Sequence, residues 1–332
     1  MTAASPLTFD PAALDPEAAA LLPRLSDADP VVRRIALLEL ADLEDENALP
    51  RIVEALQSDA SPEVRAEAAR VLASWEHGPV VEALCGALID ADAQVRAAAA
   101  QSLSELKEPV SGPALLHWVE HPQPAVQVAV LRGLRELRFP AAFEPALRAL
   151  AHARADVRLE AVSVLGWLKD ERALASLAHL SAHDDDAGVR RAAVGALGMS
   201  TTTTLASTAE ALLLALRDTA WQVREEAAAT LGKLRLGHAR EALVAALHDD
   251  YWQVRLQSAR ALGKLRDVGG AAPLVALLSH SISNLRKEAA LALGEIGDPA
   301  SSPALLAAQA DADPEVRKAV RIALQQIESR QA

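Results

Sequence analysis

The chain has 332 residues, of which 51% are hydrophobic and 23% are charged, the composition of an ordinary globular protein. Only 3% of the residues are aromatic and only 15 are Gly, which disfavours a β-rich architecture. With 33 Lys and Arg against 45 Asp and Glu, the formal net charge is −12, which opposes general attraction to phosphate backbones and anionic lipids. We therefore expect no nucleic-acid partner and no membrane partner.

The N-terminal segment, residues 1–14, has little helical periodicity, and we expect a loosely attached tail followed by one repeat domain over residues 15–332. The segment lacks the basic and apolar regions of a secretory signal, and no uncharged apolar run of about 18 residues follows it. We therefore expect a cytoplasmic protein. Only 6 of the 33 basic residues are Lys, which together with the many Ala residues suggests a GC-rich bacterial genome.

A Val-Arg dipeptide recurs along the chain and marks ten units at spacings of 31 to 34 residues. Each unit has two apolar segments of helical period, with Asp residues where the second helix needs an N-cap. One helix pair cannot bury both of its faces, so neighbouring pairs must stack. We predict an all-α fold, a right-handed α-solenoid of about ten two-helix repeats of about 31 residues. The first residues of the dipeptide and its variants are Val32, Val64, Val95, Val126, Val157, Val189, Val223, Val254, Leu285 and Val316.

The segment DTAWQVREEAA, residues 218–228, and the following LGKL, residues 231–234, resemble HEAT-like repeats of the phycobilisome-lyase type (PBS lyase). The resemblance covers about residues 15 to 330 and implies second helices that line a concave surface. It leaves the function open, because that family includes chromophore lyases, adaptor scaffolds and enzyme-associated modules. Deoxyhypusine hydroxylase, a HEAT-like di-iron enzyme, relies on repeated His-Glu dipeptides, and this sequence contains none.

We count positions along each second helix from the first residue of the dipeptide, which is offset 0. A rotation of 100° per residue then assigns each offset to a face of the helix. Offsets +4, +8 and +11 form the predicted buried stripe, and the Arg at +1 lies on its flank. We expect these Arg residues to bridge adjacent layers and to contact the loop Asp residues. Offsets +2, +3, +6 and +10 point to the concave face. Position +10 changes from acidic to apolar to basic along the chain: Asp42, Ser74, Glu105, Glu136, Trp167, Met199, Lys233, Lys264, Glu295 and Gln326.

Two groups of residues are predicted to bind a partner, because large exposed apolar side chains are unusual on a surface without one. The first group combines apolar anchors with a charged rim on the concave face; a merely solvated face is the alternative. The second group is an aromatic rim at the start of the second helices of repeats seven and eight; packing on the neighbouring loop is the alternative. The first group is Trp167, Met199, Lys233, Arg260, Lys264 and Lys287, and the second is Trp221, Tyr251 and Trp252.

The sequence offers no setting for ordinary catalysis, and we predict no catalytic residue, no cofactor and no metal site. The pairs His117/His121 and His179/His183 have the spacing of metal ligands on a helix, but a proline follows the first pair and the second pair extends into a loop, so solvated histidines are favoured. Cys85 aligns with the core of a first helix and is expected to be buried and inert. Trp75, at offset +11, is also expected in the core.

Two irregularities interrupt the repeat. Repeat four, near residues 109–137, has Gln127 in place of the Arg and a His-Pro-Gln-Pro loop at residues 121–124, so we expect the solenoid to bend or open there. Between repeats six and seven the spacing grows to 34, and an insertion near residues 200–208 begins with a polar Ser-Thr run. The second irregularity is interpreted as a tolerated surface loop.

These observations favour a non-catalytic scaffold or adaptor that binds another protein, as a helix or an extended segment, in its concave groove. The alternative is a chromophore lyase or a lyase-like chaperone, in which the Trp and Met residues of the concave face hold a bilin or another tetrapyrrole pigment. In that case the enzyme would be a lyase acting on a protein-bound chromophore. A regulatory subunit of a larger enzyme is the third hypothesis.

Overall fold

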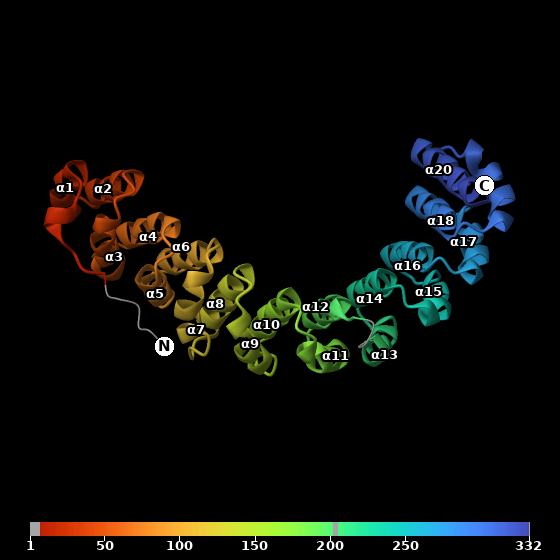
Figure 1. Cartoon of the computed structure of the whole chain (residues 1–332), viewed down its shortest axis with the longest axis horizontal. Coiled ribbons are helices and arrows are strands. Elements are labelled where there is room, and N and C mark those ends of the chain that lie inside the picture. Colours follow the sequence, from red (N-terminus) through yellow and green to blue (C-terminus); the bar gives the residue numbers. More distant parts are fainter. Residues whose placement is uncertain (1–6, 202–204, 332) are drawn as a thin grey trace. The chain divides into compact units, whose positions relative to one another are not determined.

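The computed structural model describes residues 7–201 and 205–331. Over these residues all regular structure is helical, and 20 α-helices follow one another as ten pairs joined by short 3₁₀ helices (Figure 1). The prediction of an all-α solenoid with ten two-helix repeats is confirmed. By its internal contacts the chain divides into two compact units, residues 1–168 and 169–332. No helix in the described ranges is long and apolar enough to cross a membrane.

The N-terminal unit contains five helix pairs, α1/α2 to α9/α10. Its α-helices are α1 Pro16–Leu21, α2 Pro30–Asp42, α3 Leu49–Ser58, α4 Pro62–Val71, α5 Gly78–Ala87, α6 Ala93–Ser104, α7 Gly112–Trp118, α8 Pro124–Glu136, α9 Phe143–Ala149 and α10 Ala155–Leu168. Its 3₁₀ helices are η1 Pro11–Ala13, η2 Leu22–Ser26, η3 Glu46–Ala48, η4 Leu72–Ser74, η5 Pro109–Ser111 and η6 Pro140–Ala142.

The C-terminal unit contains the pairs α11/α12 to α19/α20. Its α-helices are α11 Leu174–His183, α12 Ala187–Ala196, α13 Leu205–Ala215, α14 Trp221–Leu234, α15 Arg240–Ala246, α16 Trp252–Leu265, α17 Ala271–Leu277, α18 Ser283–Ile296, α19 Ser302–Ala307 and α20 Pro314–Gln331. Its 3₁₀ helices are η7 Glu171–Ala173, η8 Leu197–Met199, η9 Gly237–Ala239, η10 Val268–Gly270, η11 Pro299–Ser301 and η12 Ala308–Ala310.

Part of the predicted tail and part of the predicted insertion lie outside the described residues, namely residues 1–6 and 202–204. Within the tail, Phe9 lies under the guanidinium of Arg51, 4.7 Å from its Cζ to the ring centroid. The side chain of Asn47 donates a hydrogen bond to the carbonyl of Ala13 at 3.1 Å. At the insertion, the amide of Thr201 donates to Glu171 at 2.9 Å.

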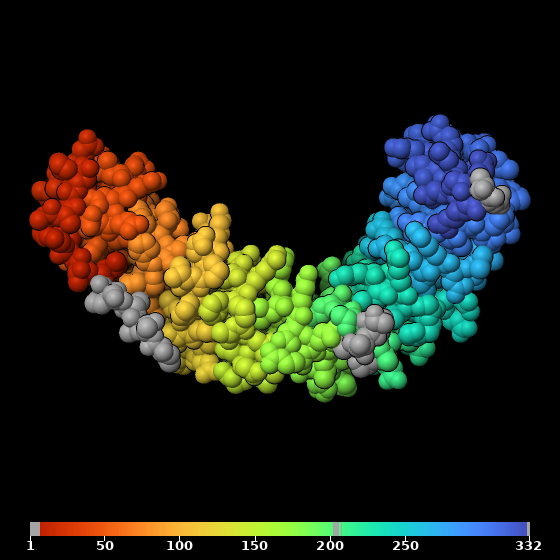
Figure 2. Space-filling view, in the orientation of Figure 1, coloured from red at the N-terminus to blue at the C-terminus, as the bar shows by residue number. Residues whose placement is uncertain are grey.

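The second helices of the C-terminal unit approach one another closely because small residues face each other between layers. A Cβ added to Gly232 would lie 2.8 Å from the Cα of Ala261, and one added to Gly263 would lie 2.8 Å from the Cα of Ala292. These helices, α14, α16, α18 and α20, therefore form a tight inner layer, with α13, α15 and α17 on the outer side of the unit (Figure 1). Figure 2 shows the same unit, coloured from green to blue, with its side chains filled in. The core is Leu, Val and Ala, and Trp75 and Cys85 are buried in it as expected.

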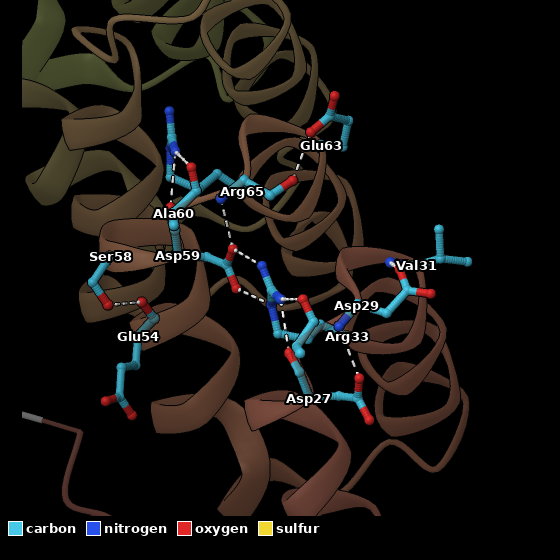
Figure 3. Close-up of polar contacts among 12 residues, drawn as sticks. Asp27, Asp29, Val31, Arg33, Glu54, Ser58, Asp59, Ala60, Glu63 and Arg65 are labelled. Atoms are coloured by element: carbon cyan, nitrogen blue, oxygen red, sulfur yellow. Dashed lines mark hydrogen bonds and ion pairs between the residues drawn. The ribbon is translucent and has the colours of Figure 1, made fainter.

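The predicted ladder of Arg and Asp residues joins successive layers on the flank of the second helices. In its first rung, the Nε and one terminal nitrogen of Arg33 donate to the carboxylate of Asp59 at 2.8 and 2.7 Å (Figure 3). The other terminal nitrogen of Arg33 donates to the carbonyl of Asp27 in its own loop at 2.8 Å. The same two-sided arrangement recurs at Arg65/Asp90, Arg190/Asp218, Arg224/Asp249 and Arg286/Asp311.

The ladder Asp residues contact the Arg residues as expected, but they stand two residues before the helix N-caps, which corrects the expectation that they cap the second helices. Asp249 stands two residues before the helix N-cap Tyr251 and accepts the amide of Tyr251 at 2.9 Å, while its carboxylate also binds Arg224. At three of the equivalent loop positions the residue is His, and its Nδ1 accepts the amide two residues later at 3.0 to 3.2 Å. These residues are His121, His152 and His280. The imidazole keeps the turn but supplies no carboxylate for the Arg.

Offset +3, expected on the exposed concave face, is buried at three repeats. Glu67, Glu160 and Glu288 are each no more than 8% exposed. Each carboxylate accepts hydrogen bonds from an Arg of the preceding layer: Arg34, Arg132 and Arg260. The assignment of faces by 100° per residue missed this burial because it describes one helix alone, whereas the neighbouring second helix covers this flank.

Candidate functional site

The predicted partner-binding residues belong to both units. Trp167, in the last turn of α10, belongs to the N-terminal unit, and the others belong to the C-terminal unit. Trp167 is 49% exposed, and the guanidinium of Arg138 lies over its ring with Cζ 4.6 Å from the centroid. Met199 ends η8 and is half-buried. Trp167 and Met199 therefore belong to different units, and each is described within its own unit.

The aromatic group of repeats seven and eight is joined by a stack between two layers. The rings of Trp221 and Tyr251 are 5.5 Å apart with an interplanar angle of 14°. The guanidinium of Arg224 lies 5.7 Å from the Tyr251 ring centroid, so the stack packs beside a rung of the ladder. Tyr251 and Trp252 remain 46% and 39% exposed. The arrangement combines loop packing with an exposed aromatic surface.

Of the predicted charged rim, one residue is already engaged. Arg260 binds the buried Glu288 through two parallel hydrogen bonds to its carboxylate, both 2.9 Å long. Its function is therefore to neutralise a buried carboxylate. Lys287, the neighbour of Glu288 on α18, is half-buried.

A groove of about 480 Å³ crosses the C-terminal ends of α14, α16, α18 and α20. It brings together two of the predicted residues, Lys233 and Lys264, with two cations that the sequence analysis missed, Arg235 and Arg266. In the described part of the C-terminal unit, none of these four side chains has an ion pair or hydrogen bond. The rest of the lining is Gly232, Glu295 and Gln326.

Arg235 and Arg266 are the residues that cap α14 and α16 at their C-terminal ends. Their φ angles are 52° and 56°, in the left-handed region that costs a non-Gly residue about 1 kcal/mol. Repeat nine places Gly297 at the same position, with φ 77°. The assignment of faces by 100° per residue ended before this residue, but the motif Gly-Lys-Leu-Arg, repeated at residues 232–235 and 263–266, was a signal that could have revealed the pair.

The N-terminal unit has a groove at the corresponding helix ends with the opposite charge. It measures about 600 Å³, and its lining includes Glu76, Glu105 and Glu136 with one cation, Lys107. Glu76 accepts the amides of Lys107 and Glu108 at 2.8 and 2.7 Å. The remaining lining residues are Ala73, Ser74, Ser104 and Leu106. The repeat therefore accepts either charge at these positions.

No cluster of metal-ligating side chains is assembled in the part of the chain that the structure describes. Within residues 7–201 and 205–331, no group of three or more His, Cys, Asp or Glu side chains could hold a metal ion. His179 and His183 stack at 4.5 Å, and His183 lies in the last turn of α11 rather than in a loop as expected. Burial raises the pKa of the Cys85 thiol, which disfavours the nucleophilic thiolate.

Comparisons with solved structures show the same kind of fold. An engineered protein from a structural genomics programme is 22% identical, with a TM-score of 0.53 over 95% of this chain and 99% of its own. YibA of E. coli is 18% identical, with a TM-score of 0.60 over 82% of this chain and 98% of its own. Importin beta is 15% identical, with a TM-score of 0.64 over 92% of this chain but 50% of its own. At these identities the similarity shows the fold alone.

No curated protein sequence gives a significant match to this chain. The sequence does match HEAT repeats over residues 18–104, 50–123, 112–198, 209–277 and 240–325. These matches cover most of the chain and both units. The chain therefore belongs to the HEAT repeat family.

Proposed function

We propose that this protein is a non-catalytic scaffold or adaptor that binds another polypeptide along the second helices of its C-terminal unit. The observation that carries the proposal is the groove across α14 to α20, whose four cationic side chains have no partner within the described part of that unit. A surface formed by packed helices is already in its binding conformation, so little ordering cost opposes association. We further propose that the protein works in the bacterial cytoplasm.

Site-specific photo-crosslinking in the native host tests this function. A photoreactive residue at Lys264 in the groove should capture a discrete polypeptide, which mass spectrometry then identifies. The matched control is the same residue at Ala276, an exposed position on the outer helix α17. Capture at Lys264 and not at Ala276 supports the proposal, whereas equal capture at both positions, or none, contradicts it.

The tetrapyrrole alternative has one observation in its favour, the exposed Trp167 ring beneath Arg138. A flat pigment can stack on such a ring while an Arg binds its carboxylates. The absorption spectrum of the protein purified from its host separates the two proposals. A visible band that disappears in Trp167→Ala would favour the lyase or chaperone function, and its absence would favour the adaptor. A regulatory subunit would instead copurify with an enzyme.

A further inference from the structure

We propose that the groove across α14, α16, α18 and α20 binds an acidic polypeptide segment in an extended conformation. The proposal rests on the protein-binding function proposed above and names the chemistry of the partner. Lys233 and Arg235 lie at the end of α14, and Lys264 and Arg266 lie at the corresponding end of α16. The groove therefore presents two pairs of cations on adjacent layers.

The cations of the groove differ from those of the ladder in what neutralises them. Arg190 and Arg224 are 12% and 14% exposed, and each is bound to an Asp carboxylate. In the described part of this unit, the four groove cations have no such counter-charge. Glu295 contributes a single carboxylate to the lining. The positive potential of the groove is therefore available to a ligand with carboxylates.

The fold does not require cations at these positions. The helix dipole favours a cation at a helix C-terminus, yet Glu105 and Glu136 occupy the corresponding helix ends in the N-terminal unit. Arg235 and Arg266 also adopt the left-handed conformation, which Gly would adopt without strain. Glu44, Arg138 and Lys169 adopt the same left-handed conformation at other repeats, so what distinguishes the groove is that both of its capping residues are cations.

The layer spacing determines the ligand's shape. Adjacent helices lie about 10 Å apart, so the two cation pairs are separated by about 10 Å. The groove crosses four such helices and is therefore about 30 Å long. An extended chain advances about 3.3 Å per residue. Acidic residues three apart would therefore meet successive cation pairs, and a segment of about ten residues would span the groove. Glu295, at the third layer, disfavours a further acidic residue there.

Charge also favours a peptide over a nucleic acid. The C-terminal unit has 19 Lys and Arg against 20 Asp and Glu, and the N-terminal unit has 14 against 25. A nucleic acid carries a charge at every nucleotide and is attracted by long tracts of cations, whereas this groove is short and ends at Glu295. Its lining contains no aromatic ring on which a base could stack.

Fluorescence anisotropy with defined probes tests the proposal on the full chain. The probe is a labelled peptide of about ten residues with two Glu residues three positions apart near one end and Ala or Ser elsewhere. Matched peptides carry Gln or Lys in place of Glu, and a single-stranded oligo-dT of the same length is the nucleic-acid probe. We expect the Glu peptide to bind at least about tenfold more tightly than the Gln peptide, with affinity that falls as salt is raised.

Two double variants separate groove charge from fold stability. Lys233→Gln with Lys264→Gln should weaken binding of the Glu peptide about tenfold or more. Arg235→Gly with Arg266→Gly should weaken it similarly without lowering the unfolding midpoint, because Gly suits the left-handed conformation. The control, Arg217→Gln with Lys318→Gln, removes two exposed cations outside the groove lining and should leave binding unchanged.

The remaining outcomes distinguish failure of this proposal from failure of the proposed function. Equal affinity for the Glu and Gln peptides would overturn the acidic preference and leave a protein-binding groove. Tighter binding of oligo-dT, or binding of no peptide at all, would overturn the acidic-segment proposal, whereas the protein-binding function is overturned only if crosslinking at Lys264 also fails. Salt-sensitive dimers of the parent protein that are lost in the groove variants would show that a second copy of this chain is the occupant, which also overturns a separate acidic partner.

Discussion

The Nε atom of Arg255 is buried without a hydrogen-bond partner, and the next layer places His280 where other layers place the accepting Asp. One layer earlier, Arg224 binds Asp249 through two nitrogens at 2.6 and 2.9 Å. The expectation that Arg255 also meets a loop Asp of the following repeat was wrong. The ladder therefore has an incomplete rung whose repair is a single substitution.

His280→Asp should raise the free energy of unfolding by about 1 kcal/mol or more, because the new carboxylate would accept both Arg255 and the amide of Ile282. Urea denaturation measures the change. The reciprocal variant, Asp249→His, should lower stability by about 1 to 3 kcal/mol. For the same reason Arg224→Ala should cost more than Arg255→Ala. A lower midpoint for His280→Asp would show that the imidazole contributes more than its turn hydrogen bond.

Gly263→Ala should destabilise the protein by about 1 to 3 kcal/mol, because the added methyl would lie 2.8 Å from the backbone of Ala292. Gly86→Ala is the matched control, since a Cβ at that position of α5 meets nothing within 4 Å. The control should gain about 0.5 to 1 kcal/mol from helix propensity. Thermal unfolding of the two variants should therefore shift in opposite directions; two shifts of the same sign would contradict close packing between α16 and α18.

Acid should weaken the ladder. The hydrogen bond from Arg65 is the main cause that holds the pKa of Asp90 below its ordinary value, and Arg286 does the same for Asp311. Because these pKa values are lower in the folded state, their contribution is complete above the unfolded-state pKa of about 4 and is lost as the pH falls through the folded-state values. Unfolding midpoints measured downward from neutral pH should fall below about pH 5. Asp90→Asn should lessen that slope; an unchanged slope would exclude this rung.

Trp167→Ala should leave stability within about 1 kcal/mol of the parent, because the exposed ring loses chiefly its contact with Arg138. Trp75→Ala should cost about 3 to 5 kcal/mol, since that ring is only 7% exposed. Chemical denaturation compares the two. Similar losses would mean that Trp167 supports the fold and is not a free surface residue.

Repeat four should exchange its amide hydrogens faster than repeat eight. His121 and His152 replace the ladder Asp on the loops of repeats four and five, and Gln127 replaces the Arg between them. Residues 117–135 should therefore be less protected than residues 248–266. Hydrogen exchange followed by mass spectrometry measures both segments in one sample. Equal protection would contradict a weak joint at repeat four.

The repeats, the helix pairs and the ladder were predictable, because a recurring Val-Arg dipeptide reports both the buried stripe and its flank. The ladder partners were only partly predictable. His280 performs the turn function of an Asp through a different atom, and residue type alone does not show this. Glu288 appeared exposed on a single-helix projection, yet its carboxylate is covered by the neighbouring layer.

The sequence analysis predicted two of the four cations in the groove. Lys233 and Lys264 followed from helical periodicity, whereas Arg235 and Arg266 lie just beyond the last helical residue, where a 100° rotation no longer applies. Their left-handed backbone returns the chain toward the next repeat. The repeated motif Gly-Lys-Leu-Arg is the sequence feature that links the four cations.

The ladder also determines how the length of such a protein can change. Its rungs join residues 25 to 28 positions apart, so each connects a layer only to its immediate neighbour. Duplication of one complete repeat inside an array would therefore add one rung of the existing type and disturb no distant contact. Folding can begin at any well-joined pair and spread in either direction, because no step requires the two chain ends to meet.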